Sequence, residues 1–171
     1  MRFLTSRHVL TIMALALLFA TLLVATMAFK PLPLLIWNAS DSVPVGLYLV
    51  RKRQPQIGEI AVIAPPDWVQ LYASSRGYLP ADVWLLKPVF AMSGSVICRV
   101  GPHVFVDGKP VARARKFDEQ QRILPVWNGC RTLEPEEDFV LAKPKNSFDS
   151  RYFGPINRGQ VKGTALPLFI P

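Results

Sequence analysis

Histidine is scarce in this chain, and its scarcity excludes several routes to hydrolysis. The sequence contains two histidines, His8 and His103. His8 belongs to the flank of a long apolar run, so a Ser–His–Asp arrangement would depend on His103 alone. His103 lies in a segment with the alternating pattern of a β-strand, which indicates that it is an ordinary strand residue. A zinc hydrolase is also excluded, because no His-Glu-x-x-His motif is present and His and Cys ligands are too few. Without a glycine-rich phosphate loop either, we expect no metal and no cofactor.

Charge is absent from the longest apolar run. Residues 9–29 contain no charged residue, proline or glycine. Twenty-one helical residues at about 1.5 Å each are long enough to cross a hydrocarbon core of roughly 30 Å. Arg2 and Arg7 precede this run, which favours a cytoplasmic N-terminus. The alternative is a cleaved secretory signal, since 25–28 offers small residues, but the apolar region of such a signal is only about 7–15 residues long.

This run divides the chain. We expect residues 1–30 to form a cytoplasmic flank and a membrane anchor (or signal sequence), and residues 31–171 to form one domain outside the cytoplasm. The net charge of +8 includes two short clusters, Arg51–Arg53 and Arg113–Lys116. Neither cluster is interleaved with aromatic residues. We therefore predict a solvated basic surface near anionic headgroups and no nucleic-acid partner.

Cysteine is as rare as histidine. Cys98 and Cys130 both fall in the part expected outside the cytoplasm, where an even count favours a disulfide and only one pairing is possible. Two separate buried thiols are the alternative. Cys98 and Cys130 are too far apart in the sequence to form a Cys-x-x-Cys redox motif. The absence of this motif also argues against a disulfide-handling protein.

All sixteen prolines of the chain lie in the exported part, which also contains many short apolar segments. This composition is typical of a mainly β domain, and we predict an antiparallel sheet or barrel with one short helix. The helix is expected to begin with Asp67 as N-cap and to end before Gly77. Asp107-Gly108 predicts a hairpin turn. The expected strands are 34–37, 45–50, 59–63, 83–90, 96–100, 103–106, one beginning at 111, 138–142 and 161–170.

Serine with lysine is the nucleophile–base pair that remains. A lysine accepts a proton only when it is neutral, so its pKa of about 10.4 must fall by several units, which burial in apolar surroundings achieves. Lys87 suits this role best, because Trp84–Leu86 precede it and Pro88–Phe90 follow it. On composition alone, a lysine on a strand is more often an edge or snorkelling residue.

Three segments resemble the S26 signal peptidases, and specifically the TraF-type branch that serves conjugative plasmid transfer. Asn38-Ala-Ser-Asp-Ser-Val-Pro-Val-Gly-Leu-Tyr48 is similar to the nucleophile segment. Leu85-Leu-Lys-Pro-Val-Phe-Ala-Met-Ser-Gly94 is similar to the lysine strand. Ser147-Phe-Asp-Ser-Arg-Tyr-Phe-Gly-Pro155 is similar to a third box. The segments occur in family order, and Lys143–Asn146 favours the TraF branch over housekeeping leader peptidases.

The resemblance implies a role for each residue. Ser42 would be the nucleophile and Lys87 its general base, with Ser40 as an oxyanion donor beside the Ser42 N–H. Ser147 would orient Lys87. Asp149 and Arg151 would pair and stiffen the site.

The resemblance also implies a substrate. It would be a pilin precursor with small residues before the cut, which is cleaved, and in some members cyclised, at the inner membrane beside the conjugative secretion machinery. Two other functions stay open: a general type I leader peptidase, and a non-enzymatic, membrane-tethered scaffold of the mating apparatus.

Overall fold

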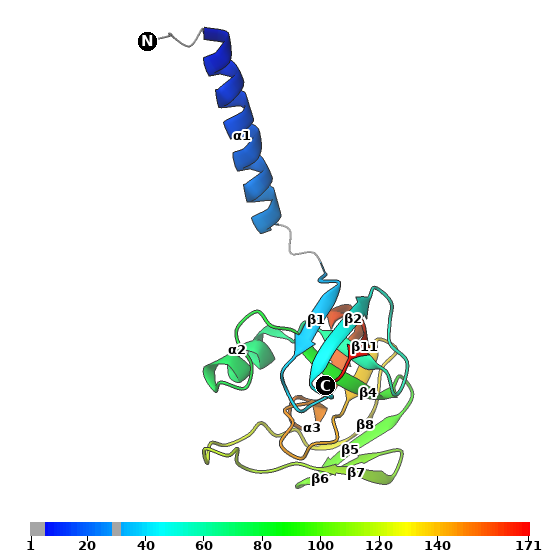
Figure 1. Ribbon diagram of the computed structural model, residues 1–171. Coiled ribbons are helices and arrows are strands. Elements are labelled where there is room, and N and C mark those ends of the chain that lie inside the picture. The colour runs from blue at the N-terminus through cyan, green and yellow to red at the C-terminus, as the bar shows by residue number, and fades with distance from the viewer. Residues whose placement is uncertain (1–5, 29–31) are drawn as a thin grey trace. The chain divides into compact units, whose positions relative to one another are not determined.

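The computed structural model describes residues 6–28 and 32–171, which form two compact units divided after Leu32 (Figure 1). The first unit is the helix α1 (Ser6–Ala28). Its segment Arg7–Val24 has a mean hydropathy of 2.0, so α1 is long and apolar enough to cross a membrane. The predicted roles of Arg2 and of the residues just after the helix concern positions outside the described residues.

The second unit is mainly β, as the sequence predicts. A seven-stranded antiparallel sheet has the order β1-β2-β11-β3-β4-β9-β10, and a four-stranded antiparallel sheet has the order β7-β6-β5-β8. In Figure 1 the smaller sheet gathers at one end of this unit. The strands of the larger sheet are β1 (Leu35–Asn38), β2 (Gly46–Arg51), β3 (Ile60–Ile63), β4 (Leu85–Met92), β9 (Glu137–Val140), β10 (Ile156–Asn157) and β11 (Val161–Phe169). Those of the smaller sheet are β5 (Val96–Val100), β6 (His103–Val106), β7 (Lys109–Arg113) and β8 (Gly129–Thr132).

Every predicted strand is present, within a few residues of its expected bounds. The predicted helix is α2 (Asp67–Ser75), and Gly77 follows it with φ of 72°. Its N-cap is Pro66 rather than Asp67, and no side chain caps it. The prediction of one short helix missed a second, single-turn helix, α3 (Ser150–Phe153), and the 3₁₀ turn η1 (Arg158–Gln160).

The Asp107-Gly108 turn joins β6 to β7 as predicted. Both residues have positive φ, 49° and 74°, which a tight hairpin needs and which glycine adopts without strain. On the other side of β5, Cys98 lies directly opposite Cys130 of β8, and a disulfide with an S–S distance of 2.07 Å joins them. The disulfide therefore ties the edge strand β8 into the smaller sheet.

Three apolar clusters among the described residues help to hold the domain together. One lies on the larger sheet and includes Ile63, Val89 and Val140. A second, around Ile97 and Phe139, joins strands of the two sheets. The third packs α2 against the 114–124 loop and the segment that ends in α3. The first and the second cluster both contain residues of β4 and β9, so these two strands are packed on both clusters and form a firm support for the segment that carries Lys87.

Candidate active site

Asn38 organises the loop that carries Ser42. The last residue of β1, it is 6% exposed, and its Nδ2 donates to the carbonyl oxygens of Ser40, Val43 and Pro44 at 2.7, 2.9 and 3.1 Å. From β2, the Tyr48 hydroxyl also donates to the Pro44 carbonyl, at 2.6 Å. These hydrogen bonds hold the loop between β1 and β2. The sequence reasoning gave Asn38 no role, although its position at the start of the motif was a usable signal.

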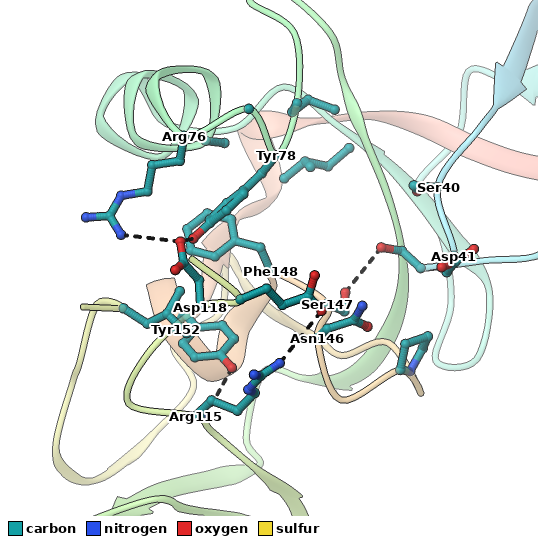
Figure 2. Close-up of a pocket in the computed structure, with 18 of the residues that line it drawn as sticks. Ser40, Asp41, Arg76, Tyr78, Arg115, Asp118, Asn146, Ser147, Phe148 and Tyr152 are labelled. Carbon is teal, nitrogen blue, oxygen red and sulfur yellow. Dashed lines mark hydrogen bonds and ion pairs between the residues drawn. The ribbon is translucent and has the colours of Figure 1, made fainter. Parts of the chain in front are cut away.

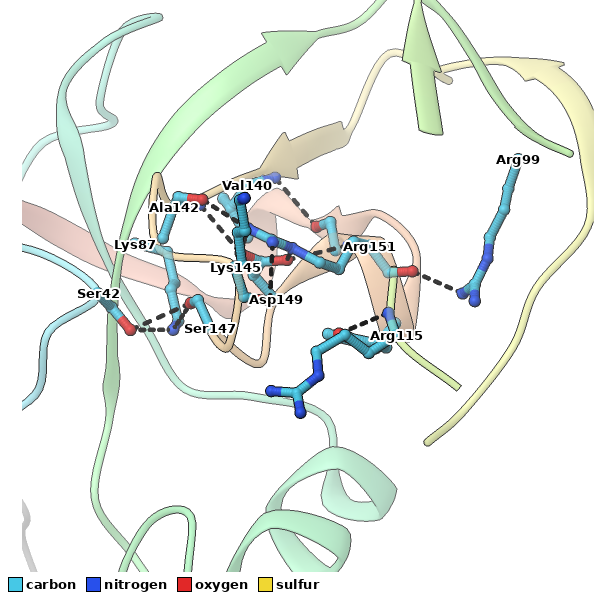
Figure 3. Close-up of polar contacts among 12 residues, drawn as sticks. Ser42, Lys87, Arg99, Arg115, Val140, Ala142, Lys145, Ser147, Asp149 and Arg151 are labelled. Carbon is cyan, nitrogen blue, oxygen red and sulfur yellow. Dashed lines mark hydrogen bonds and ion pairs between the residues drawn. The ribbon is translucent and has the colours of Figure 1, made fainter. Parts of the chain in front are cut away.

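Lys87 reaches this loop from the middle of the larger sheet. It lies on β4 opposite Ala61 of β3, and it is only 4% exposed. Its Nζ is 2.5 Å from Ser42 Oγ, although 45 positions separate the two residues. The structure thus brings together the serine and the lysine that the sequence singled out (Figure 3).

Ser147 completes a triangle of polar atoms. Lys87 Nζ donates to Ser147 Oγ at 2.8 Å, and the hydroxyl oxygens of Ser42 and Ser147 are 3.2 Å apart. Ser147 is buried, whereas Ser42 is partly exposed. Of the three groups, Ser42 is therefore the one that a molecule from solution meets first.

Burial lowers the pKa of Lys87 from 10.5 to about 8. Loss of solvation is the main cause, because it penalises the charged ammonium. The charge of Asp149 raises the pKa of Lys87 and the charge of Arg151 lowers it, so the two members of the nearby ion pair act in opposite directions. A neutral amine beside a serine hydroxyl is hence accessible near neutral pH.

Asp149 and Arg151 form a buried, bidentate ion pair behind Ser147. Arg151 Nε and Nη2 donate to the two carboxylate oxygens at 2.7 and 2.9 Å, and the two side chains are 0% and 3% exposed. Asp149 also accepts from the Ala142 N–H at 3.0 Å, and Arg151 donates to the Ala142 carbonyl at 2.5 Å. The pair thereby fastens the Ser147 loop to the end of β9 and caps α3.

Ser40 stands apart from the triangle. Its hydroxyl donates to Asn38 Oδ1 at 2.9 Å, so contact with a bound group would require its Oγ to rotate. The Ser42 N–H makes no hydrogen bond with any residue in the described part of the chain. That N–H is therefore a free donor next to Ser42 Oγ.

A cavity of about 440 Å³ opens from these groups toward α2 (Figure 2). Ser42, Lys87 and Ser147 line one end, and Tyr78, Asp118 and Arg122 line the other. The far end is rigid, because Asp118 accepts from the Tyr78 hydroxyl at 2.5 Å and from Arg122 Nε at 2.7 Å. The site is therefore an open cleft of a size that admits several residues of a polypeptide.

Other chemistries find little support around the cleft. His103 is exposed on β6, outside the residues that line the cavity. Within residues 6–28 and 32–171, no three His, Cys, Asp or Glu side chains are grouped so that they could hold a metal ion. The arrangement is suited to proton transfer between a hydroxyl and an amine.

Similar proteins were found by sequence and by structure. The family model of the signal peptidases, peptidase S26, matches residues 6–169. A plasmid transfer protein TraF from Escherichia coli is 32% identical over 142 residues, which is 77% of this chain and 80% of that protein. A conjugal transfer protein TraF from Agrobacterium fabrum is 33% identical over 144 residues, with the same coverage. A crystal structure of signal peptidase I from Enterococcus faecalis aligns with a TM-score of 0.38 and 16% identity, over 67% of this chain and 98% of that one.

Proposed function

The chain belongs to the S26 signal peptidases, and we propose that it is a serine endopeptidase that processes a pilin precursor for conjugative plasmid transfer. The observation that carries the proposal is the contact of Lys87 Nζ with the hydroxyl groups of both Ser42 and Ser147, in a partly exposed cleft. No other pair of groups among the cleft's lining residues combines a nucleophile with a buried, weakly basic partner. The relatives named for conjugal transfer support the biological setting.

The hydrogen bonds among Ser42, Lys87 and Ser147 allow an arrangement of protons that suits catalysis. When Lys87 is neutral, the Ser42 O–H donates to the Nζ lone pair, an Nζ–H donates to Ser147 Oγ, and the Ser147 O–H donates back to Ser42 Oγ. Each group then donates one hydrogen bond and accepts one. Ser147 therefore fixes the lone pair of Lys87 toward Ser42, which is the orientation that a general base requires.

The reaction follows as an acyl transfer. Ser42 Oγ attacks the carbonyl carbon of the scissile bond while its proton passes to Lys87, and Lys87 then gives this proton to the leaving amine as the C–N bond breaks. The free Ser42 N–H stabilises the oxyanion, and Ser40 adds a second donor after rotation of its hydroxyl. One such donor is typically worth about 3 kcal/mol. Water, or the amine of another chain end, then resolves the ester.

The helix α1 supports a membrane location for the proposed site. As an inner-membrane anchor, it would hold residues 31–171 at the periplasmic surface, where a substrate's own apolar segment emerges. Tethering both partners to one surface raises their effective concentration. The substrate expected from the family is a precursor with small residues before the cut, presented beside the conjugative secretion machinery.

Replacement of Ser42 by alanine tests the proposal directly. In donor cells that carry the plasmid, we expect the Ser42→Ala variant to leave the major pilin at precursor mass, because the nucleophile is absent. Intact-mass spectrometry of pilin from cells with the parent chain reports the cleavage, and a further loss of one water reports ring closure. A pilin of mature mass in the presence of the Ser42→Ala variant would support the scaffold function instead.

A general leader peptidase is the nearest rival. It would process many exported proteins and would restore growth when the housekeeping signal peptidase is depleted. We expect no such restoration by this chain, because the Lys143–Asn146 segment resembles the conjugation branch. Growth of depleted cells that depends on Ser42 would favour the rival.

The pH profile of cleavage is expected to follow the proton on Lys87. Because its pKa is about 8, the neutral fraction, and with it kcat/KM, rises about tenfold per pH unit below that value and levels off above it. Steady-state rates on a synthetic precursor peptide between pH 6 and 9.5 measure this. A profile that is flat over this range, or one that still rises steeply at its upper end, would contradict the assignment of Lys87 as the base.

A further inference from the structure

A second groove adjoins the first cavity and shares Ser42 with it. Its volume is about 1590 Å³, which exceeds the roughly 300–1,000 Å³ of a small-molecule pocket and suits an extended polypeptide. Ser42 lines both cavities, so a chain held across the nucleophile extends into each. Ile57 and Phe90 make part of an apolar floor, with 61% and 39% of their surfaces exposed.

The edge of this groove is strongly basic. Five exposed cationic side chains line it, but only one exposed carboxylate, that of Asp41. The cations come from two segments, one at the end of β7 and after it and one after β9: Arg113, Arg115, Lys116, Lys143 and Lys145. Arg151 also lines the groove, but Asp149 neutralises it.

Most of these charges lack an internal partner. Within the described part of the chain, the side chains of Arg113, Lys143 and Lys145 make no hydrogen bond and no ion pair. Arg115 has only a distant contact, 3.9 Å, with the exposed carboxylate of Glu119, and its side chain extends away from the Asp149–Arg151 pair (Figure 3). Like charges held around one groove repel each other, so a bound anion relieves that repulsion.

We propose that this basic groove binds the substrate segment on one side of the scissile bond and selects a segment with acidic residues. The inference rests on the proposed function and deepens it, because it adds a charge requirement to the small residues expected before the cut. The apolar floor takes the alternate side chains of an extended segment, and the cations at the edge take its carboxylates. An anionic lipid surface is the competing occupant, but the groove is continuous with Ser42, where only the polypeptide has to pass.

Three synthetic peptides of equal length test the charge requirement with the full-length chain in neutral detergent micelles. They share Ala-x-Ala before the cut and carry two glutamates before it, two glutamates after it, or glutamine at all four positions. We expect one of the two glutamate peptides, the one whose glutamates lie in the groove, to be cleaved with a kcat/KM about tenfold above that of the glutamine peptide. The gain should come from a lower KM, and its size is what several exposed ion pairs together contribute to binding. High salt is expected to remove this preference because it screens exposed charges.

The triple variant Arg113→Gln, Lys143→Gln, Lys145→Gln is expected to lose the preference with kcat unchanged. The matched control is Lys52→Gln, an exposed lysine that lines neither cavity, and it should keep the preference. Equal loss on acidic and neutral peptides in the triple variant, or the same loss in the control, would overturn the proposal.

Binding separates this proposal from the proposed function. With the Ser42→Ala chain and fluorescein-labelled peptides, the ratio of Kd values between glutamate and glutamine peptides reports the groove even if the parent chain cleaves nothing. Cleavage of none of the peptides by the parent would count against the peptidase, whereas equal Kd values would count against the groove's selectivity. If the triple variant loses affinity for phosphatidylglycerol vesicles but keeps the parent's Kd for every peptide, the cations serve a lipid surface and the proposal fails.

Discussion

Replacement of Lys87 by methionine is expected to lower kcat/KM for precursor cleavage by at least about 10⁴-fold, because it removes the proposed general base, and the Ser147 hydroxyl is the only other described side chain that hydrogen-bonds the Ser42 hydroxyl. Methionine has nearly the same length and is apolar, so the site keeps its shape while the base is lost. Lys87 Nζ contacts only the hydroxyl groups of Ser42 and Ser147 among the described residues, so no other hydrogen bond is broken. Single-turnover cleavage of a precursor peptide measures the effect.

The fold should tolerate this change. The lowered pKa of Lys87 means that the folded chain disfavours its ammonium form, so at neutral pH the lysine costs stability that methionine does not. The sign follows from proton binding: between pH 8 and about 10.4 the unfolded chain holds the proton and the folded chain does not, so stability rises with pH in that window. We therefore expect the Tm of Lys87→Met at pH 7 to equal or exceed that of the parent. Lys52→Met controls for the loss of a surface charge, and a Lys87→Met chain within tenfold of parental activity would exclude Lys87 as the base.

Replacement of Asp149 by asparagine is expected to cost about 3–5 kcal/mol of folding free energy, because it leaves the buried Arg151 charge without its partner. For a domain of this size the loss corresponds to a fall in Tm of roughly 10–20 °C. Activity should fall further than the folded fraction, since the pair fastens the loop that carries Ser147. Thermal unfolding followed by circular dichroism, together with rates measured well below Tm, separates the two effects.

The chain contains a matched exposed pair for comparison. Arg53 and Glu59 form the same fork, at 2.7 and 2.6 Å, but on the surface, with side chains 41% and 30% exposed. Solvent and salt screen such a pair, so Glu59→Gln should barely change Tm. If both substitutions had the same effect, burial would not be the reason for the importance of Asp149.

The sequence allowed much of the domain to be predicted, because alternating apolar residues and the Asp-Gly turn are local signals. The strand β8 was missed since all four of its residues are exposed and show no alternation, and its pairing depends on the distant β5. The helix α3 was missed because it has a single turn, held by the Asp149 side chain and by packing of Tyr152 rather than by its own propensity.

For the site, residue chemistry limited the choice to serine and lysine, and the family resemblance selected Ser42 and Lys87. Their contact was beyond prediction, because it depends on how strands far apart in the sequence are ordered in the sheet. Asn38 was marked by its position at the start of the motif, but its role as organiser depends on the convergence of three carbonyl groups on its amide, which occurs only in the folded loop.

The strand order of the larger sheet has a consequence for the order of events in folding. Within the larger sheet, two strands separate the β1–β2 hairpin that adjoins Ser42 from the strand of Lys87: β11, which pairs with β2, and β3, which pairs with β11 and with β4. β11 follows every other strand of this sheet in the sequence, and pairings between such distant segments form late in folding. Until β11 has paired on both sides, no continuous sheet joins the segment of Ser42 to the strand of Lys87, so the proposed nucleophile and base come together only late in folding.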